Sequence, residues 1–383
     1  MANTLTNLTP DLYEALDTVS RELVGLIPAV TLDANAARAA KGQTIRSAVA
    51  PSASAADITP AQIAPNTGDQ TIANKTLTIS KSRGVAIRYN GEEERGLNTG
   101  PGFNSILQMQ FAQAMRTLTN EVENDLADLY IEASNAFGTA ATTPFSTAGD
   151  FSDASFALKL LKDNGAPLTG NQLVVNSAAG AKMLGLQSRY DVQGSDSMLR
   201  QGVILSAAGM DIRESAQINS HTKGTAASST TNAAGYAIGA TVITLASVGT
   251  GTIVVGDVIT FAGDTNKYVV TSGDADVSGG GTITLGAPGL KVAITTSATA
   301  ITLVSSYTAN LAFNRSAIVL VTRAPARPIE GDLAEDVMLL TDPRSGITFE
   351  VSMYKEYRQI HFEVALAWGV SAIKPEHLAI LIG

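Results

Sequence analysis

The stretch from about Val30 to Gly100 contains almost nothing that could fold onto itself, and an amphipathic helix follows it directly. The segment Pro51 to Gln70 has four proline or glycine breakers among small polar residues, a composition that cannot bury enough apolar area to offset its ordering entropy. Two strand-like segments beyond it, Thr76 to Ser80 and Gly84 to Tyr89, need other strands to pair with. The sequence therefore predicts an arm and a loop that rest on a neighbouring molecule.

Length and charge limit the classes of protein that this chain can be. With 383 residues the chain is expected to form two or three structural units, because single cores stop growing at about 250 to 300 residues. The 26 Lys and Arg against 35 Asp and Glu give a net charge of −9, which argues against a broad basic face that binds nucleic acid. There is no cysteine, and therefore neither disulfides nor thiolate sites.

The N-terminus lacks the basic region and uninterrupted apolar block of a signal peptide. No apolar run approaches the roughly 18 residues that span a bilayer. The chain is therefore expected to be soluble and cytoplasmic when it is synthesised, with no membrane partner.

Two helices are predicted in the first part of the chain. A short one over Asp11 to Leu26 is ended by Pro28, and a loose arm follows to about Gln70. A long one over Asn104 to Ser134 would span roughly 45 Å at 1.5 Å per residue. Its apolar stripe recurs every three or four residues: Leu107, Phe111, Met115, Leu118, Val122, Leu126, Leu129, Ala133 and Phe137. Its acidic residues are expected to form a solvated face: Glu121, Glu123, Asp125, Asp128 and Glu132.

The remaining sequence changes character twice. From Phe151 to Ile218 helix and strand patterns alternate, beginning with a helix over Ser152 to Asp163, which predicts a mixed α/β unit. From Thr222 to about Ser305 short Val, Ile and Thr runs between turn residues predict a small all-β barrel or sandwich. The α/β character returns at Asn310, so the all-β unit is interpreted as an insertion at a surface loop. From Ala334 long alternating strands are expected to pack on the stripe of the long helix.

No set of side chains predicts an enzyme. His221, His361 and His377 lie far apart with no carboxylate or second histidine at ligand spacing, and His361 is expected to face solvent. Neither the GxSxG motif of serine hydrolases nor the glycine motifs of nucleotide binding occur. Asp274 to Asp276 supplies only two ligands of a calcium loop and is interpreted as a polar turn. We predict no catalytic residue, no cofactor and no metal.

The charged run after the second strand-like segment is the best candidate for contacts between subunits. Adjacent carboxylates at a loop tip are normally solvated, but here they could pair with arginines across an interface. The residues predicted to make such contacts are Arg83, Arg88, Glu92, Glu93, Glu94 and Arg95.

Five segments carry a resemblance to a known family: Leu8 to Val30, Asn66 to Asn98, Gly256 to Gly263, Asn310 to Pro325 and Asp342 to Leu381. Their order and spacing resemble the major coat protein of tailed double-stranded DNA bacteriophages. The resemblance is to the short-tailed Salmonella phage coat family, whose capsid fold of the Hong Kong ninety-seven type carries an inserted β domain.

The resemblance implies an α+β fold with a long spine helix, an extended loop and an inserted all-β barrel-like domain. The implied parts are an N-terminal helix and arm (1–65), an extended loop (66–100), the spine helix of a peripheral domain (101–138), an axial domain (139–221 and 306–334), the inserted domain (222–305) and closing strands of the peripheral domain (335–383).

The implied function is a major capsid protein that assembles into hexamers and pentamers of an icosahedral head around double-stranded DNA. Its implied location is the virion capsid, assembled in the host cytoplasm. The implied partners are other copies of the chain, a scaffolding protein, a portal, a decoration protein and DNA through weak non-specific contact. Some relatives with this fold cross-link a lysine to an asparagine; Lys75 and Lys81 are available, but no cross-link is predicted. Two alternatives stay open: an encapsulin-like compartment shell, expected to lack the insertion, and a β-rich tail or surface adhesin.

Overall fold

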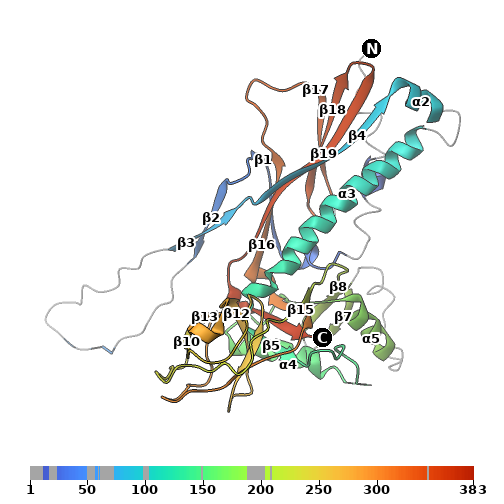
Figure 1. Cartoon of the computed structure of the whole chain (residues 1–383). Helices are drawn as coiled ribbons and strands as arrows, with labels where there is room; N and C mark the ends of the chain where they lie inside the picture. The colour runs from blue at the N-terminus through green and yellow to red at the C-terminus, as the bar shows by residue number, and fades with distance from the viewer. Residues whose placement is uncertain are drawn as a thin grey trace.

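The computed structural model describes residues 12–16, 24–49, 57–58, 60, 73–97, 103–147, 150–187, 203–207, 209–342 and 345–383. Within these ranges the chain has an α+β architecture with two large sheets. A long helix lies along one sheet, and the second sheet lies below it with two helices and a small β unit (Figure 1). Most of the predicted segment Pro51 to Gln70 and residues 17–23 of the predicted first helix lie outside the described residues.

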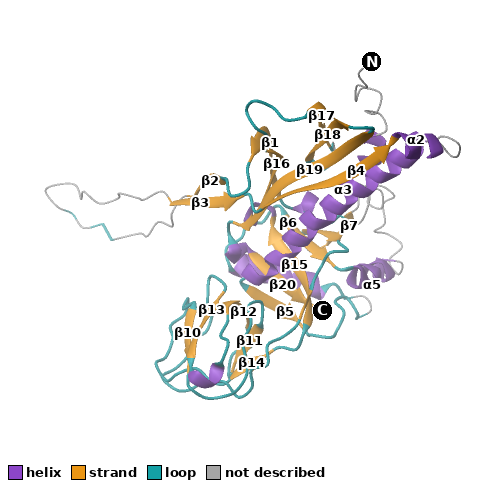
Figure 2. Ribbon diagram, turned by 45° about the horizontal axis from the view of Figure 1, so that its top comes forward, coloured by secondary structure: helices purple, strands orange, loops and turns teal. Residues whose placement is uncertain are grey.

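The first sheet has six strands and carries the long helix α3 (Phe103–Ala127), which the short 3-10 helix η3 (Asp128–Glu132) continues (Figure 2). Its order is β1 (Thr31–Ala39), β16 (Ile318–Pro325), β19 (Gln359–Ala372), β18 (Thr348–Glu356) and β17 (Ala334–Thr341), with β4 (Lys81–Asn90) also paired to β19. β1 runs parallel to β16 and the other pairs are antiparallel.

The predicted stripe of α3 is the centre of the largest hydrophobic core. All seven stripe residues from Leu107 to Leu129 are buried, and they pack with the apolar face of β18 and β19. Phe111 meets Phe362 edge to face, with ring centroids 5.6 Å apart. Full burial of a large aliphatic or aromatic side chain contributes about 1.5–3 kcal/mol. The prediction that the closing strands pack on this helix is therefore confirmed.

The second sheet has twelve strands and joins parts of the chain that are far apart in sequence. Its order is β10 (Val242–Leu245), β13 (Gly281–Leu285), β12 (Lys267–Ser272), β5 (Asn135–Gly138), β20 (Leu378–Ile382), β15 (Tyr307–Asn314), β6 (Asn171–Val175), β8 (Met210–Glu214) and β7 (Val203–Ala207). Three further strands attach to it: β9 (Ser220–His221), β11 (Val258–Phe261) and β14 (Ile301–Leu303).

The helices of this lower unit are α4 (Ser152–Asp163) and α5 (Ser177–Gln187), and α4 has the bounds that the sequence predicts. The remaining short 3-10 helices are η2 (Ile27–Ala29), η4 (Val277–Gly279), η5 (Arg315–Ala317) and η6 (Pro375–His377).

The strands between residues 242 and 303 form a small closed barrel with its own core. Pairing runs β10–β13–β12–β11–β14, and two single bridges, Thr230 to Ala300 and Thr231 to Leu245, return it to β10. Thirteen buried side chains fill it, among them Phe261 and Tyr268. Closure leaves no long unpaired edge. β12 also pairs with β5, so the barrel is tied to the body by backbone hydrogen bonds.

Two expectations about the arm and loop are wrong within the described residues. The arm is not loose throughout, because β1 pairs with β16 and β2 (Thr44–Val49) pairs with β3 (Ala73–Thr78). The segment Gly84 to Tyr89 does not need a neighbouring molecule to pair with. Its strand β4 pairs with β19 of the same chain from Lys81 to Asn90. Strand pairing is made by backbone groups, so small polar side chains do not reveal it.

The predicted division between axial and closing strands also differs at two places. β16 falls in the range assigned to the axial domain but pairs with β19 in the six-stranded sheet. β20 falls among the closing strands but pairs with β15 and β5 in the twelve-stranded sheet. The chain crosses between the sheets here, and strand partners are set by tertiary packing rather than by order in sequence.

Candidate functional site

The β2–β3 hairpin projects from the body and forms a sheet by itself (Figure 2). Its base is anchored, because Leu77 and Ile79 are buried against Val321 and Ala367. Ile79 also exchanges backbone hydrogen bonds with the Gly42–Gln43 turn at 2.9 Å. Beyond this base no other described strand pairs with either hairpin edge. The charged residues of the two strands are both cationic, Arg46 on β2 and Lys75 on β3, and Lys41 lies just before β2. Asp57, between the two strands, is the one described acidic residue of this segment.

The acidic run lies on helix α2 (Gly91–Leu97) and not on a loop tip. The Asn90 side-chain oxygen accepts hydrogen bonds from the backbone N–H groups of Glu92 and Glu93 at 3.0 and 2.8 Å. Glu93 Oε2 in return accepts from the Asn90 N–H at 3.0 Å, which completes a capping box. The Asn-x-x-Glu spacing was the sequence signal for this helix start. Glu92 and Glu94 make no ion pair with any described residue.

Two of the three arginines predicted to make contacts between subunits already face carboxylates of their own chain. Arg83 Nε lies 3.3 Å from Glu121 Oε2, and Arg88 Nε lies 4.0 Å from Glu356 Oε2. Both arginines are more than half exposed, so these pairs are weak. Arg95 is exposed on α2. The fold thus brings Arg88, Arg95 and the acidic residues to one end of the six-stranded sheet, with Arg83 further along β4.

Glu123 contradicts the prediction of a solvated acidic helix face, since it is only 1% exposed. Its Oε1 accepts from the N–H groups of Gly25 and Leu26 at 2.7 and 2.6 Å and from Ser215 Oγ at 2.8 Å, and its Oε2 accepts from the Ile27 N–H at 3.0 Å. Burial raises the pKa of Glu123, against the opposing effect of these hydrogen bonds. The carboxylate joins α3 to the N-terminal segment and to the residue after β8.

Glycine is required beside this joint. A Cβ on Gly25 would lie 2.5 Å from the carbonyl oxygen of Glu214. One feature of the sequence could have predicted that Glu123 is buried. Thr119 and Ala127 lie one turn before and after it and are small enough to form a second buried stripe on the helix, and both are buried.

Asp125 is a second acidic residue of α3 that faces the protein. It accepts from Trp368 Nε1 at 2.8 Å and from Lys81 Nζ at 2.7 Å. The Lys81 ammonium also lies 5.9 Å from the Trp368 ring centroid, within cation–π range. These contacts fix the rotation of the helix on its sheet.

His221 has a carboxylate partner that sequence spacing did not reveal. Its Nε2 lies 2.9 Å from Asp257 Oδ1 and its Nδ1 lies 3.0 Å from the hydroxyl of Tyr130. Asp257 also accepts from the N–H groups of Gly224 and Val254. The histidine and aspartate side chains are 5% and 0% exposed, so the cluster is a joint between barrel and body with no room for a substrate.

The other two histidines do not belong to a buried cluster with an aspartate and a tyrosine. His361, predicted to face solvent, is partly buried, with Nδ1 3.6 Å from Glu356 Oε1. Burial lowers the pKa of His377. The Asp274–Asp276 segment is the polar turn that was predicted, with Asp276 accepting from the Ser278 N–H at 3.0 Å.

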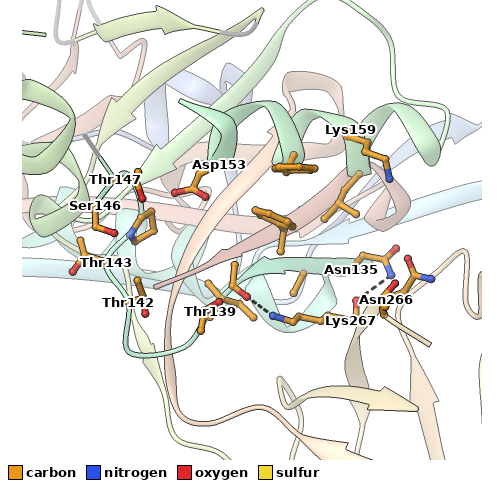
Figure 3. Close-up of a pocket in the computed structure, with 18 residues that line it drawn as sticks. Asn135, Thr139, Thr142, Thr143, Ser146, Thr147, Asp153, Lys159, Asn266 and Lys267 are labelled. Carbon is orange, nitrogen blue, oxygen red and sulfur yellow. Dashed lines mark hydrogen bonds between the residues drawn. The ribbon is translucent and has the colours of Figure 1, made fainter. Parts of the chain in front are cut away.

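A cavity of about 520 Å³ lies between barrel and body (Figure 3). Its walls come from β5, the loop 139–147, α4 and the turn before β12. Among the described residues no group of three or more histidine, aspartate or glutamate side chains is placed to hold a metal ion. None of the described helices is both long and apolar enough to cross a membrane.

Comparisons with known proteins give long but distant structural matches. No protein-family model and no curated protein sequence matches the chain. A structure of Mycobacterium phage Che8 matches at 13% identity over 90% of this chain and 85% of that one, with a TM-score of 0.42. The capsid structure of cyanophage P-SCSP1u matches at 11% identity over 92% and 86%, with a TM-score of 0.45. The virus-like particle from Pyrococcus furiosus matches at 11% identity over 98% and 100%, with a TM-score of 0.45. At these scores the matches carry no weight in the functional proposal.

Proposed function

We propose that this chain is a major capsid protein, the repeated subunit of an icosahedral shell of the kind that forms the head of tailed DNA bacteriophages. The observation that carries the proposal is the β2–β3 hairpin, whose outer edges pair with no described strand. An isolated two-stranded hairpin is marginally stable in water, and open edges invite pairing with another chain. A neighbouring copy would supply the missing contact.

The charges at the two ends of the molecule support a head-to-tail contact between copies. The cationic hairpin and the acidic helix α2 lie at opposite ends of the upper unit (Figure 1). Complementary charge steers association and fixes its register. Contacts of this heterologous type close into rings when the rotation between neighbours allows it. Hexamers and pentamers of one chain are such rings.

The rigid upper unit supports the same proposal. The helix α3 is held on its sheet by the buried stripe, by the Glu123 joint and by the contacts of Asp125 with Lys81 and Trp368. A subunit that must repeat at nearly constant angles in a closed shell benefits from a stiff frame between its contact ends. The same unit offers no accessible set of catalytic side chains among the described residues.

The type of head, the role of the barrel, the partners and the location of the chain are also part of this proposal. The sequence resemblance supports a head of the short-tailed Salmonella phage coat type, in which the barrel is the inserted domain. The encapsulin-like alternative would be expected to lack such a barrel. A scaffolding protein, a portal and a decoration protein are proposed partners, in a virion capsid assembled in the host cytoplasm. The net charge of −9 fits weak, non-specific contact with packaged DNA.

Electron microscopy and sedimentation of the purified full-length chain test the proposal directly. We expect closed shells with hexameric and pentameric clusters at high protein concentration. A compact monomer at every concentration would overturn the proposal, and open fibres would favour the adhesin alternative.

A charge reversal on the hairpin tests the observation that carries the proposal. Arg46 is exposed on β2 and makes no ion pair with a described residue. We expect Arg46→Glu to reduce shell yield strongly while the unfolding midpoint of the subunit stays unchanged. The matched control is Lys223→Glu, an exposed lysine at the root of the barrel, which should assemble normally. Equal shell yields from both variants would remove the hairpin from the assembly contact.

A further inference from the structure

The cavity between barrel and body is lined by side chains that take no part in the proposed contacts between subunits. Its volume of about 520 Å³ falls in the range of small-molecule sites. The body contributes β5, the loop 139–147 and α4 to its lining, and the barrel contributes the turn that enters β12, which pairs with β5. A molecule in the cavity would therefore contact both units at once.

Lys267 supplies a cation without a matching anion. Its ammonium group donates to the carbonyl oxygen of Gly138 and makes no ion pair with a described carboxylate. Burial lowers the pKa of Lys267. By contrast Lys159, on the α4 wall, already lies 3.1 Å from Asp163. A half-buried charge that has only a carbonyl partner is incompletely compensated, so an anion beside Lys267 would be stabilised.

Two phenylalanines give the cavity a flat apolar wall. Phe137 and Phe156 stack with centroids 4.6 Å apart and ring planes 21° apart. Phe156 nevertheless remains 44% exposed. An aromatic ring of a ligand could continue this stack.

A buried acceptor completes the set of binding groups. Asn135 is 1% exposed, and its amide nitrogen donates to the carbonyl oxygen of Lys267 at 3.2 Å. Its Oδ1 is buried and has no hydrogen-bond partner among the described residues, and Asn135 is one of the residues that line the cavity. Buried acceptors without donors are costly, so a ligand O–H or N–H group would be favoured there.

The one carboxylate in the lining does not oppose an anion at Lys267. Asp153 lies apart from Lys267 in the cavity (Figure 3). Its Oδ2 accepts from the Phe145 N–H at 2.8 Å, which partly compensates its charge.

We infer that this cavity binds a small aromatic carboxylate that carries a hydrogen-bond donor. The carboxylate would pair with Lys267, the ring would stack on Phe156, and the donor would bond to Asn135 Oδ1. Because the ligand touches barrel and body, its binding would tighten the junction between them. The inference does not depend on shell assembly, because the cavity lies within a single subunit.

Ligand-observed NMR with 4-hydroxybenzoate on the unassembled full-length chain tests the inference. We expect saturable binding, and much weaker binding of the neutral analogue 4-hydroxybenzamide and of inorganic phosphate. Lys267→Met should weaken 4-hydroxybenzoate binding about tenfold, the effect of losing one charge-assisted hydrogen bond. The matched control is Lys291→Met, a barrel lysine whose pKa burial also lowers but which does not line the cavity. This control should bind as the wild type does.

Three outcomes would overturn the inference. They are no saturable binding of 4-hydroxybenzoate, equal binding of the benzamide, and unchanged affinity in Lys267→Met. If Lys267→Met does not fold, Phe156→Ala replaces it, because that side chain is partly exposed and its truncation leaves the core intact. Unchanged affinity in Phe156→Ala would equally overturn the inference.

Discussion

Replacing Glu123 by alanine should release the N-terminal segment from the long helix. The carboxylate accepts four hydrogen bonds, three of them from consecutive backbone N–H groups, and is 1% exposed. A buried N–H group left without an acceptor costs about 1–3 kcal/mol. Local movement and water entry will recover part of this cost for the three amides. We therefore expect the free energy of unfolding to fall by about 3–5 kcal/mol, the lower part of the summed cost of three unsatisfied amides.

Glutamine at the same position should separate hydrogen bonding from charge. The Oε1 atom can still accept from Gly25, Leu26 and Ser215, but an amide N–H₂ would then face the Ile27 N–H. One lost acceptor costs about 1–3 kcal/mol, and removal of a buried charge offsets part of it. Glu123→Gln should therefore lose less stability than Glu123→Ala.

Urea unfolding of the unassembled chain, followed by the fluorescence of the single tryptophan, measures both effects. Trp368 is fully buried beside Asp125 of the same helix, so its emission reports loss of this packing. The matched control is Glu121→Ala, on the same helix with a side chain 33% exposed, where we expect a change of about 0–1 kcal/mol. A loss in Glu123→Ala no larger than in this control would refute the reasoning.

The pH dependence gives a second test of Glu123. Burial raises its pKa above the ordinary 4.5, so the folded chain holds this proton more tightly than the unfolded chain. Stability from the protonated form is then fully present below pH 4.5 and is lost as pH rises through the folded-state pKa. The wild type should therefore lose stability relative to Glu123→Gln as pH rises above 4.5. A constant difference between the two across this range would contradict the assigned shift.

Three further predictions concern assembly and the barrel. The double variant Glu92→Lys, Glu94→Lys should reduce shell yield. If these residues meet Arg46 of a neighbouring copy, adding Arg46→Glu should restore part of the yield. No restoration in low salt, where charge pairs are screened least, would exclude that pairing. Asn90→Ala should destabilise α2 by about 1 kcal/mol through loss of its cap, seen as faster amide hydrogen exchange in α2; unchanged exchange would contradict the capping role. Replacing residues 222–305 by a short linker should leave most of the α/β circular-dichroism signal intact. It should lower the melting temperature, because the pairing of β12 with β5 is lost. Loss of all structure would mean that the barrel is part of the main core.

Local sequence patterns determined the elements whose side chains follow a regular period. The stripe from Leu107 to Leu129 predicted α3 and its buried face, and the alternation around Phe349 and Phe362 predicted the strands that cover it. Short Val, Ile and Thr runs between glycines predicted an all-β unit between residues 222 and 305, because β-branched side chains and turn residues act locally. The acidic run was predicted to be a loop tip, but it forms helix α2, whose capping box was missed.

Tertiary structure alone decided which backbone edges meet and which charges are buried. β1 and β4 find partners in β16 and β19 of the same chain, through backbone hydrogen bonds that leave no pattern in side-chain composition. Glu123 and Glu121 lie on one helix with the same side chain, yet one is buried against three backbone amides and the other is partly exposed. Periodicity records which face of an element is apolar, but the partner of a polar group depends on segments that folding brings together from distant parts of the chain.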